Sequence, residues 1–298
     1  MTTFLQLLFS GLALGAVYAL VALGFVVIYR SSQVFNFAQG EFLTVGAFTM
    51  VALYRMKLPW WFALLGTLVI TGLVAAGVER VALRPLVGRP VFVTIIVTIF
   101  VGFLLRLAAI LIWGTDPQGM PTPWETTGVV EVAGARILTN SVAAVAAGGV
   151  ALAAFFLLIR YTRLGVAMRA AASDQETALA LGIPVGRIFG STWFIAGALA
   201  ALGGVFLGMF PRSVDANLGF VAFRAFPAVI VGGLDSAAGT VIAGLLLGVM
   251  EVLTQGYINQ HLGDFGDNFH AVFPYLVMIL FLVVRPYGLL GTKDVERV

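Results

Sequence analysis

Long apolar runs separated by short polar segments make up nearly the whole chain. The runs are about 20 residues long, which is the length that a helix needs to cross the hydrocarbon core of a bilayer. They lack the strict polar and apolar alternation of barrel strands, and a helix satisfies its own backbone hydrogen bonds in lipid. We therefore predict an all-α fold, a polytopic transmembrane helical bundle that forms a single domain over residues 1–298. The predicted spans cover residues 4–29, 35–54, 60–78, 91–113, 139–159, 188–210, 220–234, 239–257 and 272–284.

Two of these runs are weaker candidates for a full span. The run at 220–234 is short and the run at 35–54 begins with polar residues, so either could be a half-span or a broken helix. The total is therefore about 8–10 spans, broken and half-spans included. The count above predicts an outside N-terminus and an inside C-terminus, whereas an even total places the N-terminus inside.

Arginines gather at one set of loops and so indicate the orientation of the chain. Arg80, Arg84 and Arg89 follow the third run, further arginines occupy the segment 160–187, and Arg285 follows the last run. Because positively charged loops stay on the cytoplasmic side, all three places are predicted to be cytoplasmic. The acidic, proline-containing loop at about 114–138 is then predicted to lie outside.

The composition and motifs disfavour several classes of function. Only 10% of residues are charged, and the net charge of +3 comes from scattered arginines rather than from a basic tract that would bind nucleic acid. There is no cysteine, and no P-loop, HExxH or GxSxG motif. The two histidines, His261 and His270, are too few and too far apart for a metal-ligand cluster. We expect no catalytic residue, no metal site and no cofactor bound by this chain.

Polar side chains begin the second run, in the sequence FNFAQGEF. In a bilayer such groups are candidates for function or for pairing between helices. A water-lined break in a helix would explain Asn36, Gln39 and Glu41, with Gly40 letting the backbone bend. The alternative is that these residues lie at the level of the cytoplasmic headgroups, with Glu41 in the first turn of a helix, where the helix dipole favours an anion.

Two further charged residues, Arg106 and Glu251, lie well inside apolar runs. An unpaired charge at the middle of a spanning helix costs at least ~2.5 kcal/mol. The two residues could pair with each other, or each could reach water near the end of its helix. A role in fixing the packing of helices is favoured over contact with a substrate.

Glycines recur at small-residue spacing in several runs. Gly11 and Gly15 form GLALG, and Gly244 and Gly248 form GLLLG. Because this spacing lets helix backbones approach closely in lipid, we predict that these glycines pack helices together and do not take part in permeation.

The segment 160–187 is polar and rich in alanine, unlike the rest of the chain. From Met168 onward an uneven amphipathic pattern is compatible with a short helix along the membrane surface. Gly182 can end this helix and Pro184 prevents its simple continuation. An ordinary solvated loop is the alternative.

Four long motifs carry a resemblance that covers nearly the whole chain. They are GLALGAVYALVALGFVVIYRSSQVFNFAQGEFLTVGAF (11–48), TRLGVAMRAAASDQETALALGIPVGRI (162–188), FRAFPAVIVGGLDSAAGTVIAGLLLGVMEV (223–252) and RPYGLLG (285–291). With these motifs in this order, the chain resembles the LivH-like permease subunits of bacterial ABC importers for branched-chain amino acids, members of the binding-protein-dependent transport inner-membrane family. The resemblance implies a fold similar to that of the vitamin-B12 and ribose permeases, with broken or tilted helices around a translocation path.

The same resemblance implies a cytoplasmic coupling loop at 160–187, whose short helix sits in a groove of an ATPase subunit. The general loop pattern of importers starts Glu-Ala-Ala and ends with a distant glycine, whereas here Arg169 precedes the alanines. The implied coupling residues are Arg169, Ala171, Ala172, Asp174, Glu176, Ala178, Gly182, Ile183 and Pro184.

The partners implied are a second, LivM-like permease subunit, two cytoplasmic ATPase subunits that hold ATP and Mg²⁺, and a periplasmic substrate-binding protein. The implied location is the bacterial inner membrane, and the implied substrates are branched-chain or related small amino acids. Alternatives are an importer of the same family for urea or short amides, a secondary transporter or channel, and a purely structural membrane subunit. Asn36, Gln39, Glu41, Arg106 and Glu251 are the candidates for the translocation path or for pairing of helices.

Overall fold

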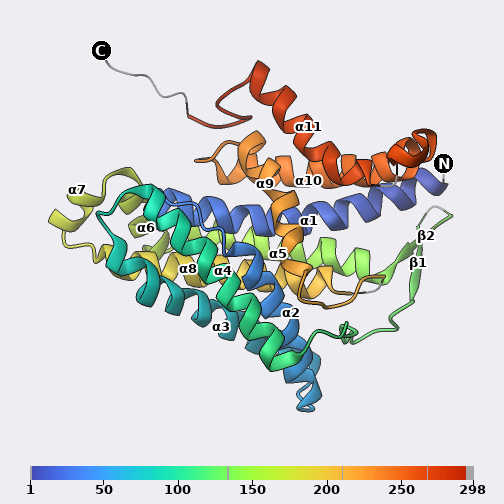
Figure 1. Cartoon of the computed structure of the whole chain (residues 1–298), viewed down its shortest axis with the longest axis horizontal. Coiled ribbons are helices and arrows are strands. Elements are labelled where there is room, and N and C mark those ends of the chain that lie inside the picture. The colour runs from blue at the N-terminus through green and yellow to red at the C-terminus, as the bar shows by residue number, and fades with distance from the viewer. Residues whose placement is uncertain (1, 133, 210, 267, 293–298) are drawn as a thin grey trace.

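The computed structural model describes residues 2–132, 134–209, 211–266 and 268–292. Within the described residues it is a bundle in which α1, α5, α8 and α10 lie along the long axis and α2 and α4 cross it at an angle, with one small β-hairpin (Figure 1). Six helices, some with their short extensions, are long and apolar enough to cross a membrane, and shorter apolar helices accompany them. The predicted all-α fold is confirmed. In the part of the chain that the structure describes, the nine main helices are α1 (Thr2–Ser32), α2 (Gln39–Arg55), α3 (Trp60–Val78), α4 (Val91–Trp113), α5 (Thr139–Tyr161), α8 (Val185–Leu207), α9 (Val221–Gly232), α10 (Ala237–Leu253) and α11 (Phe269–Val284).

Shorter elements connect these helices. Helices α6 (Arg163–Ser173) and α7 (Gln175–Ala180) lie between α5 and α8, and the strands β1 (Val129–Val132) and β2 (Ala135–Leu138) pair antiparallel in the loop before α5. The π-helix η1 (Glu79–Leu83) and the 3₁₀-helix η2 (Arg84–Leu86) extend α3. The remaining short helices are η3 (Leu218–Phe220), η4 (Thr254–Ile258), η5 (Asn259–His261) and η6 (Gly263–Gly266).

The core forms around α1, which packs on α5, α8, α9 and α10. Glycines allow its close approach to α10. A Cβ atom added to Gly15 would lie 2.8 Å from the Cα atom of Leu245, and one added to Gly244 would lie 2.8 Å from the backbone nitrogen of Ala19. The predicted packing role of these glycines is confirmed, because no side chain fits between the two backbones.

The two ends of the bundle differ in character (Figure 1). Helix α1 runs from the end that carries the β-hairpin to the end that carries α6 and α7. Thr2 lies close to Gly134 of the hairpin loop. The start of the chain therefore shares an end of the bundle with the loop 114–138, and the segment 160–187 lies at the opposite end.

Both runs that the sequence marks as weak form short helices. Helix α2 begins only at Gln39 because residues 33–38 leave the helical path after α1, and Gln33 adopts a positive φ of 55°. Helix α9 has 12 residues and contains Pro227. Helix α8 begins earlier than predicted, directly after Pro184, whose fixed φ suits the position before a first helical turn.

Candidate functional site

The turn between α1 and α2 and the first turn of α2 together hold three polar side chains inside the protein. Asn36 and Gln39 have no exposed surface and Glu41 retains 7%. The Asn36 Oδ1 atom accepts from the Ala38 backbone N–H at 3.0 Å, and the Gln39 Nε2 atom donates to the Ala196 carbonyl oxygen at 3.1 Å. Ala196 lies at the middle of α8. The turn therefore reaches the middle of the bundle.

Burial in the protein explains why an irregular backbone is tolerated there. Non-helical backbone at membrane depth needs protein or water to satisfy its hydrogen bonds. The Thr98 hydroxyl of α4 serves this purpose, because it accepts from the Phe37 N–H at 3.3 Å and lies 3.4 Å from the Phe35 carbonyl oxygen. This placement favours a broken helix over residues at the headgroup level.

Glu41 of α2 and Arg106 of α4 form an ion pair, with 2.5 Å between the Arg106 Nη2 and Glu41 Oε1 atoms. The guanidinium carbon of Arg106 also lies 3.8 Å from the centre of the Phe220 ring, a cation–π contact. Both charged side chains are largely buried. The pair therefore joins two helices that the sequence places in different runs.

Glu251 of α10 has different partners. Its Oε2 atom accepts from the Tyr18 hydroxyl at 2.6 Å, and its Oε1 atom lies 3.3 Å from the Arg224 Nη1 atom of α9. The suggested pairing of Arg106 with Glu251 is therefore wrong, because each residue meets a nearer opposite charge. Sequence reasoning missed Arg224, although a charged residue within the predicted span 220–234 was a signal of the same kind as Arg106.

The segment between α5 and α8 forms two helices rather than the predicted one. Asp174 separates them with an extended backbone, and its Oδ1 atom accepts from the Thr177 N–H at 3.0 Å as the N-cap of α7. Hydrogen bonds from the Thr177 hydroxyl and N–H hold the pKa of the Asp174 carboxyl below its usual value. Gly182 follows α7 with a φ of +81°, a conformation that glycine adopts without strain.

The predicted coupling residues fall on different faces of this helix pair. Asp174, Glu176, Gly182 and Pro184 are exposed, and Ala172 and Ile183 are half-buried. Ala171 and Ala178 are buried against the rest of the chain, so of the predicted coupling residues these two lie on the inward face of the helix pair. Arg169 is exposed and donates to the Ile159 carbonyl oxygen of α5.

The exposed face of this segment carries two large apolar side chains, whereas Ala171 and Ala178 are buried. Leu179, in α7, and Leu181, directly after it, are 58% and 75% exposed, and both follow Asp174 and Glu176 within the same segment. The sequence signal for them was weak, because an apolar residue in a short helix is as easily buried as exposed. The result is a mixed acidic and apolar surface at one end of the bundle.

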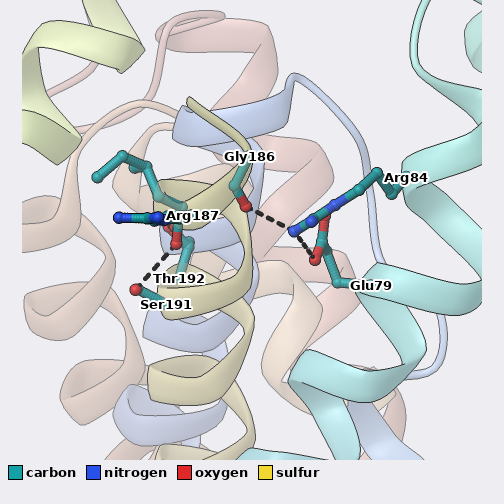
Figure 2. Close-up of polar contacts among 7 residues, drawn as sticks. Glu79, Arg84, Gly186, Arg187, Ser191 and Thr192 are labelled. Carbon is teal, nitrogen blue, oxygen red and sulfur yellow. Dashed lines mark hydrogen bonds and ion pairs between the residues drawn. The ribbon is translucent and has the colours of Figure 1, made fainter. Parts of the chain in front are cut away.

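Besides the hydrogen bond from Arg169 to Ile159, two further contacts join segments at this end of the bundle. The Gln175 Nε2 atom donates to the Ser31 carbonyl oxygen at the end of α1, at 3.1 Å. Figure 2 shows the second contact, in which Arg84 binds the buried carboxylate of Glu79 through two nitrogens, at 3.1 and 2.8 Å, and donates to the Gly186 carbonyl oxygen at 2.6 Å. Arg84, predicted only as a marker of topology, thus joins the turn between α3 and α4 to the first turn of α8.

No group of three or more His, Cys, Asp or Glu side chains that could hold a metal ion occurs among the described residues. His270 contacts Asn259 through its Nδ1 atom at 2.9 Å, and His261 lies in η5. The described polar sites are therefore hydrogen-bond and ion-pair networks between helices.

Six helices that are long and apolar enough to cross a membrane, joined to shorter helices by buried charge pairs, define a multi-pass α-helical membrane protein. Residues 7–282 match the model of the family described as "Branched-chain amino acid transport system / permease component". The chain belongs to this family of membrane permeases.

Several relatives agree over nearly their full length. The chain is 33% identical to the "High-affinity branched-chain amino acid transport system permease protein LivH" of Escherichia coli (strain K12), over 99% of this chain and 98% of the relative. It is 32% identical, with the same coverage, to the similarly named permease protein BraD of Pseudomonas aeruginosa. A probable LivH of Methanocaldococcus jannaschii is 27% identical over 93% of this chain and 90% of its own length. No solved structure matches significantly.

Proposed function

We propose that this chain is the membrane-spanning subunit of an ATP-driven ABC importer for branched-chain amino acids. The observation that carries the proposal is the match to the permease family over residues 7–282. The importer would contain a second permease subunit in the same bilayer, two ATPase subunits that hold ATP and Mg²⁺, and a periplasmic binding protein that delivers the substrate. The complex would lie in the bacterial inner membrane.

The geometry supports a coupling role for the α6–α7 helix pair. Asp174 and Glu176 are exposed beside Leu179 and Leu181, a combination suited to a protein partner with basic and apolar groups. Arg160, Arg163 and Arg169 at the same end favour the cytoplasmic side. The opposite end, with the β-hairpin and the start of the chain, would then receive the loaded binding protein.

We propose that the importer works by alternating access. ATP-driven closure of the ATPase subunits would displace α6 and α7, and this displacement would reach the spanning helices through the contacts of Arg84 and Gln175. Glu41, Arg106, Asn36, Gln39 and Glu251 would either line the path or hold the helices that line it.

Reconstitution in proteoliposomes tests the proposal. The chain is combined with its second permease, ATPase and binding-protein partners, and uptake of labelled leucine is measured with ATP or the loaded binding protein omitted in turn. We expect uptake only when both are present. Uptake that is indifferent to ATP would instead identify a secondary carrier, and uptake of urea or a short amide without uptake of leucine would keep the mechanism but change the substrate.

A further inference from the structure

A cavity of about 420 Å³ lies where the ends of α1 and α5 meet the start of α10. Helix α6 and the segment that follows α11 close its remaining sides. The volume falls within the range of ligand pockets in proteins. The cavity is at the end of the bundle that carries the α6–α7 pair, the end that the proposed function assigns to the cytoplasm (Figure 1).

Two arginines line this cavity from different helices. Arg30, in the last turn of α1, is half-buried, and Arg169 of α6 is exposed, so both side chains have surface that a ligand can touch. Arg169 donates to the Ile159 carbonyl oxygen, and within the described ranges neither arginine forms an ion pair. Because a guanidinium has five N–H donors, both arginines can still bind an anion in the cavity.

One acidic side chain, Asp235, also lines the cavity. Its carboxylate accepts from the Thr292 hydroxyl and from the Thr292 N–H, with 3.1 Å between the Thr292 nitrogen and the Asp235 Oδ2 atom. The lining therefore contains two positive groups and one negative group, a net charge of +1. A ligand with one negative charge would neutralise it.

The wall of the cavity beside the arginines is apolar. It includes Phe155 and Phe156 of α5 and Val27 of α1. At a rise of 1.5 Å per residue, Phe155 lies about 9 Å before the last residue of α5, which is deeper than a headgroup layer of about 5–8 Å. Val150 and Leu157, two turns apart on α5, are exposed, so apolar surface continues along the outside of this helix.

This combination matches the two ends of a phospholipid. Basic pockets between spanning helices on the cytoplasmic side bind anionic headgroups, and an acyl chain covers apolar surface that would otherwise meet water. A free phosphate ion would satisfy Arg30 and Arg169 but would leave Phe155 and Phe156 uncovered. An acidic protein surface at the end of the bundle would do the same.

We propose that this cavity binds a phospholipid of the cytoplasmic leaflet that carries one net negative charge. Arg30 and Arg169 bind its phosphate, and an acyl chain lies along Phe155 and Phe156. Because Arg169 belongs to α6, the bound lipid joins the α6–α7 pair to the ends of α1 and α5. The site requires only that the chain lies in a bilayer, so it stands apart from the proposed transport function.

Binding is measured by native mass spectrometry on the full chain in detergent. Phosphatidylglycerol and phosphatidylethanolamine with the same acyl chains are added in turn. We expect phosphatidylglycerol to bind at least about fivefold more tightly, the effect of one further charge interaction near the membrane surface. Equal binding of the two lipids would overturn the proposal. Displacement of phosphatidylglycerol by an equal concentration of inorganic phosphate would also overturn it, because the site would then take a free anion.

Variants locate the binding. Arg30→Gln and Arg169→Gln should each weaken phosphatidylglycerol binding about tenfold, the effect of losing a hydrogen bond to a charged group. The matched control is Arg163→Gln, which alters an exposed arginine of the same α6 helix outside the cavity lining and should leave binding unchanged. Equal weakening by all three variants would show a diffuse attraction of headgroups to a basic surface and overturn the site.

Labelling locates the lipid where an arginine variant does not fold. The chain has no cysteine, so Ala238→Cys places a unique thiol at an exposed position of the cavity lining. We expect phosphatidylglycerol, but not phosphatidylethanolamine, to slow its reaction with a water-soluble maleimide severalfold. Ala180→Cys, at the exposed end of α7, should react at the same rate with either lipid. Equal protection of both thiols, or of neither, overturns the site.

The same thiol tests two other occupants. Protection of Ala238→Cys that requires added ATPase subunits instead of lipid would assign the cavity to a protein partner. Protection by phosphatidylglycerol that appears only after removal of residues 293–298, which include Asp294 and Glu296, would assign it to an acidic segment of this chain. Either result overturns the lipid site.

Discussion

Arg106 of α4 lies 2.5 Å from Glu41 of α2, and this ion pair is the direct charged link between the two helices. Helix α4 packs chiefly on α2 and on the turn that follows α3, and most of its surface faces outward. Because α4 has few other packing partners, the ion pair and the contact of Arg106 with Phe220 contribute much of what holds α4 in position.

Breaking one side of this pair should destabilise the protein more than removing both charges. Glu41→Gln or Arg106→Met alone leaves a buried charge without its counter-charge, a loss of roughly 3–5 kcal/mol, whereas the double variant leaves none. We expect the double variant to unfold at a higher temperature than either single variant, measured as a double-mutant cycle in detergent. Additive losses would show that the pair is not coupled.

Adding a methyl group where α1 and α10 touch should destabilise the protein. Gly15→Ala would place a Cβ atom 2.8 Å from two backbone atoms of Leu245, so the helices must separate. We expect a loss of roughly 1–3 kcal/mol, seen as a lower thermal midpoint. Gly149→Ala is the matched control, because nothing lies within 4 Å of its added Cβ atom and alanine favours the helix. A midpoint that falls equally in both variants contradicts this account.

Charge reversal on the α6–α7 pair should weaken assembly with the ATPase subunits. A single exposed charge contributes about 1 kcal/mol or less, so Asp174→Lys and Glu176→Lys are combined. We expect less ATPase to co-purify and less uptake. The control is the reversal of Glu125 and Glu131, which are exposed in the loop at the other end and should leave the amount of co-purified ATPase unchanged. Unchanged assembly and uptake would remove Asp174 and Glu176 from the contact.

The N-cap of α7 must be separated from this charge effect. Asp174→Asn keeps a capping acceptor but removes the charge, whereas Asp174→Ala removes both the charge and the cap. If Asp174→Asn reproduces the loss of assembly, charge is responsible. Intact assembly in Asp174→Asn together with loss in Asp174→Ala assigns the effect to the cap.

Arg84 should matter for the transfer of motion rather than for folding alone. Arg84→Gln removes the link between Gly186 and the α3–α4 turn, and we expect uptake per ATP hydrolysed to fall severalfold, within the range for residues that couple distant sites. Arg80→Gln, an exposed arginine in the same turn, is the control. Equal loss of uptake and ATPase activity would leave Arg84 a structural role only.

The link made by Arg84 can also be tested without mutating Arg84. The chain has no cysteine, so Val87→Cys and Ser191→Cys provide unique labels on the two joined segments. We expect the distance between the labels to stay the same with and without ATP, because the contact of Arg84 moves the segments together. A distance that changes with nucleotide would contradict the link.

Much of the fold could be predicted from local patterns. The nine helical runs, the short second and seventh helices, and the packing role of Gly11, Gly15, Gly244 and Gly248 all follow from the length of apolar runs and the spacing of small residues. The capping role of Asp174 was harder to predict from the sequence, because it depends on a break that splits one expected helix into two.

The length of the apolar runs and the order of the motifs are properties of the chain alone, and they suffice to predict a membrane bundle of the permease family with a polar segment at one end. Which charges meet depends instead on how the helices pack. Arg106 pairs with Glu41, and Glu251 with Arg224 and Tyr18, because contacts between helices depend on their order, rotation and depth in the bundle. The spacing of residues along the chain does not specify the order, rotation or depth of the helices. The cavity beside Arg30 is therefore seen only in the packed structure.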